Sequence, residues 1–382
     1  MKKIALISYH NEPNYGTMLQ AYALYKTIHK LGFESEYISY NAQPNGWLRY
    51  WMLLKKILKT PSIVLKRALG KPSKPGEFSF FKTDDFKNII KAYNQWYQEY
   101  IPHTSIAYTH QNIASIEMKY DSFIVGSDQT WSPYRNESYP SFFLNFLQFV
   151  KDKNKKNSYA PSFGTLSLSD KYCSKIKNEL NKFMNVSCRE SKNAEYLSAQ
   201  WGIPVKTVLD PTLLLTPQEW NEVAKPIQMP AKYILCYILG EKECISRFAE
   251  KLGKKQGIPV YYILTRPYYL NKNNILNNVG PGEFLSLICN ASCVCTDSFH
   301  GTIFSINYNI PFYSFTKRKS TETINDNDRI QQVLSEFNLL NRFRDDKDDS
   351  IDNCMINFID ANKHLNNMRC FSNNYLKTIL NV

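Results

Sequence analysis

The sequence lacks the patterns that mark disulfide-stapled, zinc-binding or membrane-spanning proteins. Its nine cysteines are odd in number and scattered, without a Cys-x-x-Cys pair, which argues against a disulfide framework and a zinc site. No stretch approaches the roughly twenty consecutive apolar residues that cross a bilayer. The first apolar run ends at Ser8 before Tyr9-His10-Asn11, so we expect a strand there rather than a signal peptide. We therefore expect a cytoplasmic protein with reduced thiols.

The chain has fewer acidic than basic residues. It contains 34 Asp and Glu and 47 Lys and Arg, which gives a formal net charge of +13. Such a balance favours an anionic partner, whether nucleic acid, an anionic membrane or a phosphorylated substrate. Residues 47–71 carry seven cations and no acid, and on a helical wheel Trp47 and Trp51 lie opposite most of the charge. This segment predicts a basic amphipathic helix on a membrane surface, the alternative being a core-packed helix with a solvated lysine face. The sequence contains no zinc-finger, RNP-like or helix-turn-helix pattern, so we do not expect nucleic acid binding.

Short apolar segments alternate with helical ones along the chain, which predicts an α/β fold with mostly parallel sheets covered by helices. Two prolines between Asp210 and Pro217 forbid a continuous helix and mark a domain boundary. We expect two facing, doubly wound Rossmann-like domains at 1–214 and 215–345, and a C-terminal helical arm at 346–382 that packs back across both. The expected strands are 4–8, 34–40, 122–125, 157–160, 186–189, 205–209, 233–239, 260–264 and 293–296. The expected helices are 17–30, 80–100, 191–201, 241–256, 283–290 and, weakly, 351–380.

One polar turn carries most of the chemistry. The apolar run ending at Cys295 stops at Thr296-Asp297-Ser298-Phe299-His300-Gly301, and a helical pattern follows. Ligands of open α/β sheets bind beyond the carboxyl ends of strands, so this turn is a candidate site. His300 can exchange a proton near neutral pH, and Gly301 lets a phosphate approach the backbone. Alternatively, Asp297 or Ser298 caps the helix and His300 is a satisfied, half-buried histidine.

Two further polar turns follow expected strands. The loop from Ser8 to Thr17 leads into a helix whose N-terminal amides could hold an anion, but it lacks the spacing of known phosphate loops. The turn Gly126-Ser127-Asp128-Gln129-Thr130-Trp131 combines a carboxylate, an amide and an indole. That mixture is typical of carbohydrate sites, and equally of a capping turn over a buried tryptophan.

The turns at Ser162 and Arg189 also follow expected strands. Ser162-Phe163-Gly164 reads by itself as a plain strand exit. Arg189 suits a carboxylate or phosphate ligand because its guanidinium forms paired hydrogen bonds. An Arg189–Glu190 pair is not expected, since adjacent strand residues face opposite ways.

Together these turns resemble the polysaccharide pyruvyl transferase family. The motifs that carry the resemblance span about residues 4–313 and are Ser8-Tyr9-His10-Asn11, Asn14-Tyr15-Gly16, Val125-Gly126-Ser127-Asp128-Gln129-x-Trp131, Ser162-Phe163-Gly164, Arg189-Glu190, Asp210-Pro211-Thr212 with Trp220, and Thr296-Asp297-Ser298-Phe299-His300-Gly301-Thr302. The resemblance implies a GT-B-like fold with the active site in the cleft between its domains. It also implies transfer of the pyruvyl group of phosphoenolpyruvate onto a sugar as a cyclic ketal. Better-studied members have Arg-Leu-His where this chain has Ser298-Phe299-His300, so one expected cation is missing.

The implied reaction assigns expected roles to these residues. His300 is the expected acid and base, with Asp297 orienting its ring. The expected donor ligands are Arg189, Ser298, Gly301, Asn14 and Gly16, and the expected acceptor ligands are Asp128, Gln129, Trp131 and His10. Phosphoenolpyruvate carries about three negative charges near pH 7, which fits the basic balance of the chain. No metal and no separate cofactor are expected.

The expected setting is the assembly of a bacterial-type surface polysaccharide, such as an exopolysaccharide or capsule. The expected acceptor is a saccharide, lipid-linked, at the inner face of the cytoplasmic membrane, with residues 47–71 as a peripheral contact. One alternative keeps the fold and uses a sugar nucleotide, as a GT-B glycosyltransferase does. Another is a non-catalytic protein that binds membrane or polysaccharide through the basic helix and the 26 tyrosines.

Overall fold

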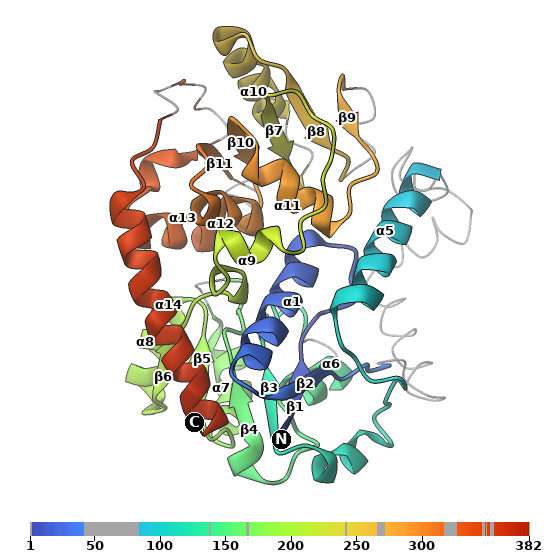
Figure 1. The fold of residues 1–382 in the computed structure, drawn as a ribbon. Coiled ribbons are helices and arrows are strands. Elements are labelled where there is room, and N and C mark those ends of the chain that lie inside the picture. Colours follow the sequence, from blue (N-terminus) through green and yellow to red (C-terminus); the bar gives the residue numbers. More distant parts are fainter. Residues whose placement is uncertain are drawn as a thin grey trace, which may run out of the picture.

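The computed structural model contains two larger parallel β-sheets and a two-stranded parallel sheet, covered by helices (Figure 1). It describes residues 2–41, 84–136, 139–165, 168–240, 243–265, 272–316, 327–345, 348, 350–351 and 355–381. The predicted α/β class with parallel sheets is therefore confirmed. The basic segment 47–71 lies outside the described residues, so its predicted helix stays a prediction. Within the described ranges, no helix is long and apolar enough to cross a membrane.

The first sheet has the strand order β2-β1-β3-β4, and all its pairs are parallel. Its strands are β1 (Lys3–Ile7), β2 (Glu34–Tyr37), β3 (Ser122–Val125) and β4 (Lys156–Ser158). Beside β4 lies a second parallel pair, β5 (Val186–Cys188) with β6 (Val205–Thr207). Two serines join β5 to β4, because the Ser187 backbone N donates to Ser158 Oγ at 2.8 Å and Ser187 Oγ donates to the Ser158 carbonyl at 2.9 Å.

The second sheet has the order β12-β11-β10-β7-β8-β9 and is also parallel throughout. Its strands are β7 (Ile234–Tyr237), β8 (Val260–Ile263), β9 (Ile275–Leu276), β10 (Cys293–Thr296), β11 (Phe312–Phe315) and β12 (Phe343–Arg344). Every residue of β7, β10 and β11 is buried, as expected for central strands with helices on both faces. The sequence patterns did not predict β9, β11 or β12.

The α-helices are α1 (Tyr15–Lys30), α5 (Asp84–Tyr100), α6 (Tyr139–Asn145), α7 (Asp170–Leu180), α8 (Ser191–Trp201), α9 (Pro217–Asn221), α10 (Glu243–Gln256), α11 (Pro281–Cys289), α12 (Phe299–Tyr308), α13 (Asn327–Glu336) and α14 (Ile359–Leu380). Short 3-10 helices occur at Ile113–Lys119, Lys153–Lys155, Pro211–Leu213 and Leu340–Arg342. Helix α8 has the predicted bounds, whereas α6, α7 and α13 were not predicted. The strand expected at 186–189 ends at Cys188, so Arg189 and Glu190 lie in the loop before α8.

The long C-terminal helix α14 packs back onto both sheets, as expected for the arm (Figure 1). At its middle it contacts α12 of the second sheet, where Arg369 Nη2 donates to Asn307 Oδ1 at 2.6 Å. Near its end it reaches the first sheet, where Tyr375 Oη donates to the Ser158 carbonyl at 3.0 Å. Lys2 Nζ also donates to the carbonyl of Leu380 at 3.2 Å.

One continuous hydrophobic core joins the two sheets. It includes residues of β1, α1, β7, α11, β10, α12 and α14. At the junction, the ring of Tyr15 in α1 stacks on Phe284 in α11 with centroids 4.3 Å apart, and Tyr15 Oη donates to the Val279 carbonyl at 2.8 Å. Because the core is shared, the domain division at 214–215 stays a prediction.

The docking of α14 generates a stability prediction. Leu376 is fully buried in the shared core, so Leu376→Ala should lower the free energy of unfolding by about 2–5 kcal/mol through lost burial and a residual cavity. Leu340 is 50% exposed, and Leu340→Ala should change the free energy of unfolding by less than about 0.5 kcal/mol. Urea unfolding of the two variants measures both values. Equal effects would show that α14 does not stabilise the fold as its burial indicates.

Candidate active site

Each sheet has one pair of neighbouring strands whose following connections run to opposite sides of the sheet. In the first sheet this pair is β1, which continues to β2, and β3, which continues to β4 on the other side. In the second sheet it is β7, which continues to β8, and β10, which continues to β11. Open parallel sheets bind ligands at the carboxyl ends of such strand pairs. The polar turns identified in the sequence after β1, β3 and β10 lie at the carboxyl ends of these strands.

The turns after β1 and β3 are bonded to each other. Thr17 Oγ1 donates to Asp128 Oδ2 at 2.9 Å, and Ser8 Oγ donates to the Ser127 carbonyl at 3.0 Å. Asn14 caps α1, because its Oδ1 accepts a hydrogen bond from the Thr17 backbone N at 3.2 Å. The first turn of α1 is therefore held next to the Asp128 carboxylate.

The turn after β10 is bonded to the loop after β7. Asp297 accepts backbone hydrogen bonds from Leu239 at 2.6 Å and from Gly240 at 2.8 Å. Ser298 caps α12, and its Oγ accepts from the Gly301 backbone N at 3.3 Å. The capping alternative is therefore correct for Ser298, and His300 follows in the first turn of α12.

The two turns meet where Gly16 packs against His300. A Cβ atom at position 16 would lie only 1.9 Å from His300 Nδ1, so only glycine permits this contact. The first turn of α1 and the first turn of α12 therefore converge on one imidazole. Helix N-termini attract anions through their free amides and the helix dipole.

Asp210 connects the turn at Arg189 to this meeting point. Its Oδ2 accepts a hydrogen bond from Arg189 Nη1 at 2.7 Å and lies 3.7 Å from His300 Nε2. Its Oδ1 accepts from the Thr212 backbone N at 3.0 Å and from Thr212 Oγ1 at 2.8 Å. At 3.7 Å the His300 contact is an ion pair when the ring is protonated, rather than a hydrogen bond.

The carboxylates of the site are held in their charged form. Burial alone would raise the pKa of Asp210, but His300 and Arg189 outweigh burial and hold this pKa well below its usual range. Burial likewise raises the pKa of Asp128, and the charges of His300 and Arg189 lower it overall. The buried carboxylate of Asp210 and the half-buried carboxylate of Asp128 are therefore anions close to the Arg189 guanidinium and the His300 imidazole.

Phe299 brings a second guanidinium into the site. Arg189 Cζ lies 4.1 Å and Arg329 Cζ 5.9 Å from the centroid of the Phe299 ring. With its amide oriented to suit both side chains, Gln129 accepts hydrogen bonds from Arg329 Nη2 at 2.9 Å and Nη1 at 3.3 Å. Arg329 belongs to α13, where no sequence motif indicated a functional residue.

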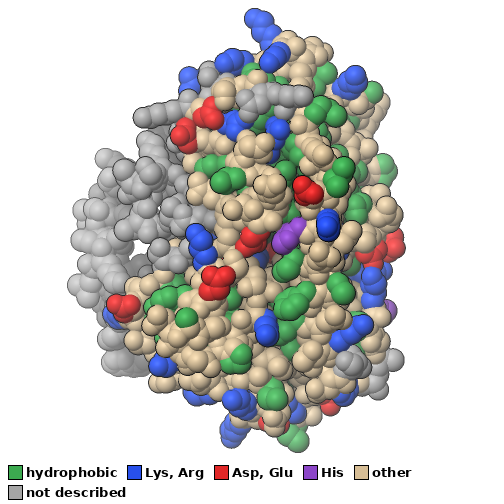
Figure 2. All heavy atoms as spheres, turned by 90° about the vertical axis from the view of Figure 1, so that its left-hand side faces the viewer, with side chains coloured by type: hydrophobic (Ala, Val, Ile, Leu, Met, Phe, Trp, Pro, Cys, Tyr) green, Lys and Arg blue, Asp and Glu red, His purple; other side chains and the backbone are tan. Residues whose placement is uncertain are grey.

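A narrow pocket opens onto these groups. Its lining includes Arg189, Asp210, Phe299 and Arg329, and its volume is only about 40 Å³. That space holds about one water molecule, so a larger ligand can enter only if side chains move. The face that carries α13 and α14 shows basic, acidic and histidine side chains close together near its middle (Figure 2). Within the described ranges, no cluster of His, Cys, Asp and Glu could hold a metal ion.

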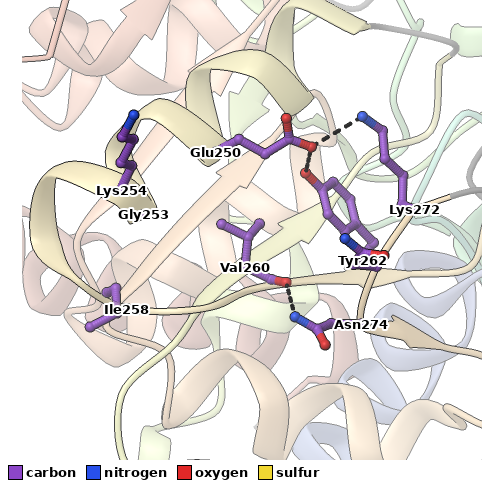
Figure 3. A pocket seen from close by; sticks show the side chains of 9 residues that line it. Glu250, Gly253, Lys254, Ile258, Val260, Tyr262, Lys272 and Asn274 are labelled. Carbon is purple, nitrogen blue, oxygen red and sulfur yellow. Dashed lines mark hydrogen bonds and ion pairs between the residues drawn. The ribbon is translucent and has the colours of Figure 1, made fainter.

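A different hollow lies between α10 and the start of β8 (Figure 3). There Glu250 Oε1 accepts hydrogen bonds from Tyr262 Oη at 2.9 Å and from Lys272 Nζ at 3.1 Å. The hollow includes Ile258 and Val260, at the amino end of β8. Because this is the opposite edge of the sheet from the polar turns, we do not assign it to the site.

Comparison with known proteins identifies the family. A model of polysaccharide pyruvyl transferases matches residues 14–316, a range that includes Arg189, Asp210 and His300. The chain belongs to the polysaccharide pyruvyl transferase family. It is therefore an enzyme of this family, and the resemblance expected from the sequence is confirmed. No curated protein matches the sequence.

Solved structures similar to this pyruvyl transferase are distant. The UDP-GlcNAc 2-epimerase from Methanocaldococcus jannaschii is 12% identical with a TM-score of 0.49, covering 96% of this chain and 99% of that one. The putative UDP-N-acetylglucosamine 2-epimerase from Listeria monocytogenes is 11% identical with a TM-score of 0.49, covering 100% and 96%. The UDP-GlcNAc 2-epimerase from Neisseria meningitidis is 12% identical with a TM-score of 0.46, covering 97% and 100%.

Two of the residues expected to act in this pyruvyl transferase point elsewhere. The Asp297 carboxylate binds the backbone after β7, and the carboxylate beside His300 is that of Asp210. Trp131 is fully buried, packs on Phe146 and Phe163, and donates its indole N–H to the Asn145 carbonyl at 3.0 Å. Its ring therefore cannot stack on a sugar in this structure, and the alternative of a buried tryptophan under the turn is correct.

His10 is also set apart from the site of this pyruvyl transferase. Its ring stacks on Tyr37 and Tyr97, and its Nδ1 lies 2.8 Å from the Ser8 carbonyl. Burial lowers the pKa of His10 to about 4, so the ring is neutral at pH 7. His10 lines a separate hollow with Tyr9, Glu12 and Asn145, and its expected contact with an acceptor stays a prediction.

The Arg189–Glu190 contact corrects another expectation. Arg189 Nε lies 3.5 Å from Glu190 Oε1, although strand alternation predicted that the two side chains diverge. Because β5 ends at Cys188, neither residue is in the strand and the alternation does not apply. Glu190 also accepts hydrogen bonds from Ser162 Oγ and from the Phe163 backbone N, which gives the turn at Ser162 a structural role.

The depressed pKa of Asp210 generates a pH prediction. A lowered folded-state pKa adds stability above the unfolded value of about 3.9, and this contribution is lost as the pH falls through the folded-state pKa. Asp210→Asn should lower the free energy of unfolding by about 3–5 kcal/mol at pH 7, because Arg189 loses its buried carboxylate partner. The difference in the free energy of unfolding between Asp210→Asn and the unmodified protein should become smaller below about pH 4.

Denaturant unfolding between pH 7 and pH 3 measures this difference. Glu195 is exposed on α8, and Glu195→Gln should remain close to the unmodified protein throughout. A gap between Asp210→Asn and the unmodified protein that stays constant across this range would contradict the charged state assigned to Asp210.

Proposed function

We propose that this enzyme transfers the pyruvyl group of phosphoenolpyruvate onto a sugar of a polysaccharide or lipid-linked saccharide. The product is a cyclic ketal, and phosphate is released. The observation that supports this proposal is the convergence of His300 and Arg189 on Asp210 Oδ2, at the point where the two sheets present their polar turns. The proposed proton donor and the proposed anion ligand therefore both lie beside the same carboxylate oxygen.

The proposed reaction needs a proton at one carbon and an oxygen at its neighbour. Protonated His300 gives its proton to the methylene carbon of phosphoenolpyruvate, and a sugar hydroxyl attacks the adjacent carbon. The hydroxyl proton passes to the imidazole that has just become neutral. A second hydroxyl of the sugar then bonds to the same carbon, phosphate leaves with the C–O electron pair, and the hydroxyl proton returns to a base. His300 Nε2 forms no hydrogen bond with any described residue, which leaves it available for this exchange.

The donor is a small anion with about three charges near pH 7, and several groups of the site suit it. Arg189 Nη2 forms no hydrogen bond with any described residue and lines the pocket. The first turns of α1 and α12, with Gly16 and Gly301, add oriented amides. Asn14 and Ser298 cap these helices, so their proposed role is to hold the amides in place.

Asp210 takes the positioning role that the sequence suggested for Asp297. It lies beside Nε2 of His300 and holds Arg189 by a 2.7 Å hydrogen bond, so it fixes the acid and the anion ligand relative to each other. Asp128 is the proposed acceptor ligand, together with Gln129, because both lie at the first sheet's turn. We retain as proposals a cytoplasmic location at the inner membrane face and a role in capsule or exopolysaccharide assembly.

The decisive experiment follows phosphate release from phosphoenolpyruvate in the presence of candidate saccharides. His300→Ala should reduce acceptor-dependent release by more than about a hundredfold, because the proton donor is lost, while phosphoenolpyruvate still binds. His29 is exposed near the end of α1, and His29→Ala should release phosphate at the unmodified rate.

A parallel incubation with a sugar nucleotide tests the glycosyltransferase alternative. Glycosyl transfer from the nucleotide, without acceptor-dependent phosphate release from phosphoenolpyruvate, would refute the proposal. Full activity of His300→Ala would refute the role of the imidazole. No turnover of either donor by the unmodified protein, with binding to polysaccharide or membrane, would favour a non-catalytic function.

A further inference from the structure

The charge of Arg189 is already matched within the protein. Its Nη1 binds Asp210 at 2.7 Å, and its Nε lies 3.5 Å from Glu190 Oε1. Both carboxylates line the same pocket as the guanidinium. A donor that brings about three more negative charges needs a second cation there, because an excess of buried anions is strongly unfavourable. Ser298 carries no charge, so the turn before α12 does not supply this cation.

Arg329 occupies the place where the second cation is needed. Its side chain is 6% exposed, and it lines the pocket with Arg189, Asp210 and Phe299. Both guanidiniums lie within 6 Å of the Phe299 ring centroid, close enough for cation–π attraction. Arg329 also helps to lower the pKa of Asp128, although burial, His300 and Arg189 act on this carboxyl more strongly.

Helix α13 is anchored so that Arg329 stays at this position. One turn further along, Gln332 Nε2 donates to Ser191 Oγ at 2.7 Å, and Ser191 Oγ donates to Glu336 Oε1 at 2.8 Å. Ser191 begins α8, two residues after Arg189. On its other side the guanidinium of Arg329 binds the Gln129 side chain in the turn after β3. The contact of α13 with the start of α8 and the bond of Arg329 to Gln129, in the turn after β3, therefore place the Arg329 guanidinium.

We propose that Arg329 is a donor-binding residue that holds the anionic groups of phosphoenolpyruvate together with Arg189, next to the Phe299 ring. The identity of the anion rests on the proposed function. Better-studied members of the family have an arginine at the position of Ser298, in the turn before α12. In this chain Arg329 of α13 supplies that charge instead. Because α13 lies between β11 and β12 of the second sheet, whereas Arg189 follows β5 of the pair beside the first sheet, the donor site is complete only when both parts of the fold contribute.

Calorimetric titration with phosphoenolpyruvate tests this role without requiring an acceptor. Arg329→Ala should weaken binding roughly tenfold to a hundredfold, as expected for the loss of a hydrogen-bonded charge. Arg329→Lys should bind more tightly than Arg329→Ala, because it keeps the charge and loses the forked geometry. The matched control is Arg342, which is also buried and lies 5.6 Å from an aromatic ring, that of Tyr313, away from the pocket. Arg342→Ala should bind phosphoenolpyruvate as the unmodified protein does.

The outcomes separate this inference from the proposed function. If the unmodified protein binds phosphoenolpyruvate and a folded Arg329→Ala binds it equally well, Arg329 is not a donor ligand. If the unmodified protein binds no phosphoenolpyruvate, the proposed function itself fails. Circular dichroism and the thermal midpoint establish folding. Should Arg329→Ala unfold, Arg329→Gln, which keeps length and polarity without charge, provides the same comparison.

Discussion

The buried carboxylate of Asp210 is the constraint on which the rest of the site depends. It accepts hydrogen bonds from Arg189 and Thr212 and lies beside the imidazole of His300. An isolated buried charge is very unfavourable, so Asp210 can remain ionised only while these partners surround it. The segment after β6, the start of α8 and the start of α12 therefore have to meet at one point. That requirement fixes the imidazole of His300 and the guanidinium of Arg189 at a set separation.

The convergence also explains why the site is built from two parallel sheets. In each sheet the polar turns follow two neighbouring strands whose connections run to opposite sides of the sheet. Each sheet also directs one helix N-terminus toward His300. Neither sheet alone contains both the imidazole and the guanidinium of Arg189. Gly16 allows the two helix starts to approach this closely, because a larger side chain would occupy the place of the ring.

Much of the fold could be predicted from sequence, because apolar strands followed by polar turns are a local signal. The strands of the first sheet and the core of the second were found in this way, and short edge strands such as β12 were not. The site was harder to predict, because Asp210 and Asp297 both follow strand ends and only the fold decides which faces His300. Trp131 also follows a strand end, and the sequence alone could not show that its ring is buried rather than available to a sugar. Arg329 lies in a helix without a motif, so only its packing against Phe299 reveals it.

The aromatic contact between Tyr15 and Phe284 limits how the molecule can admit a ligand. Swinging the sheets apart like a hinge would bring these rings, and the core residues around them, into water. Each exposed side chain would cost roughly 1.5–3 kcal/mol, so a wide opening is costly. Rotamer changes and small shifts of α13 are the less expensive entry route. We therefore expect movements of a few side chains, rather than a rotation of one sheet against the other, to control how fast a ligand enters and leaves the narrow pocket.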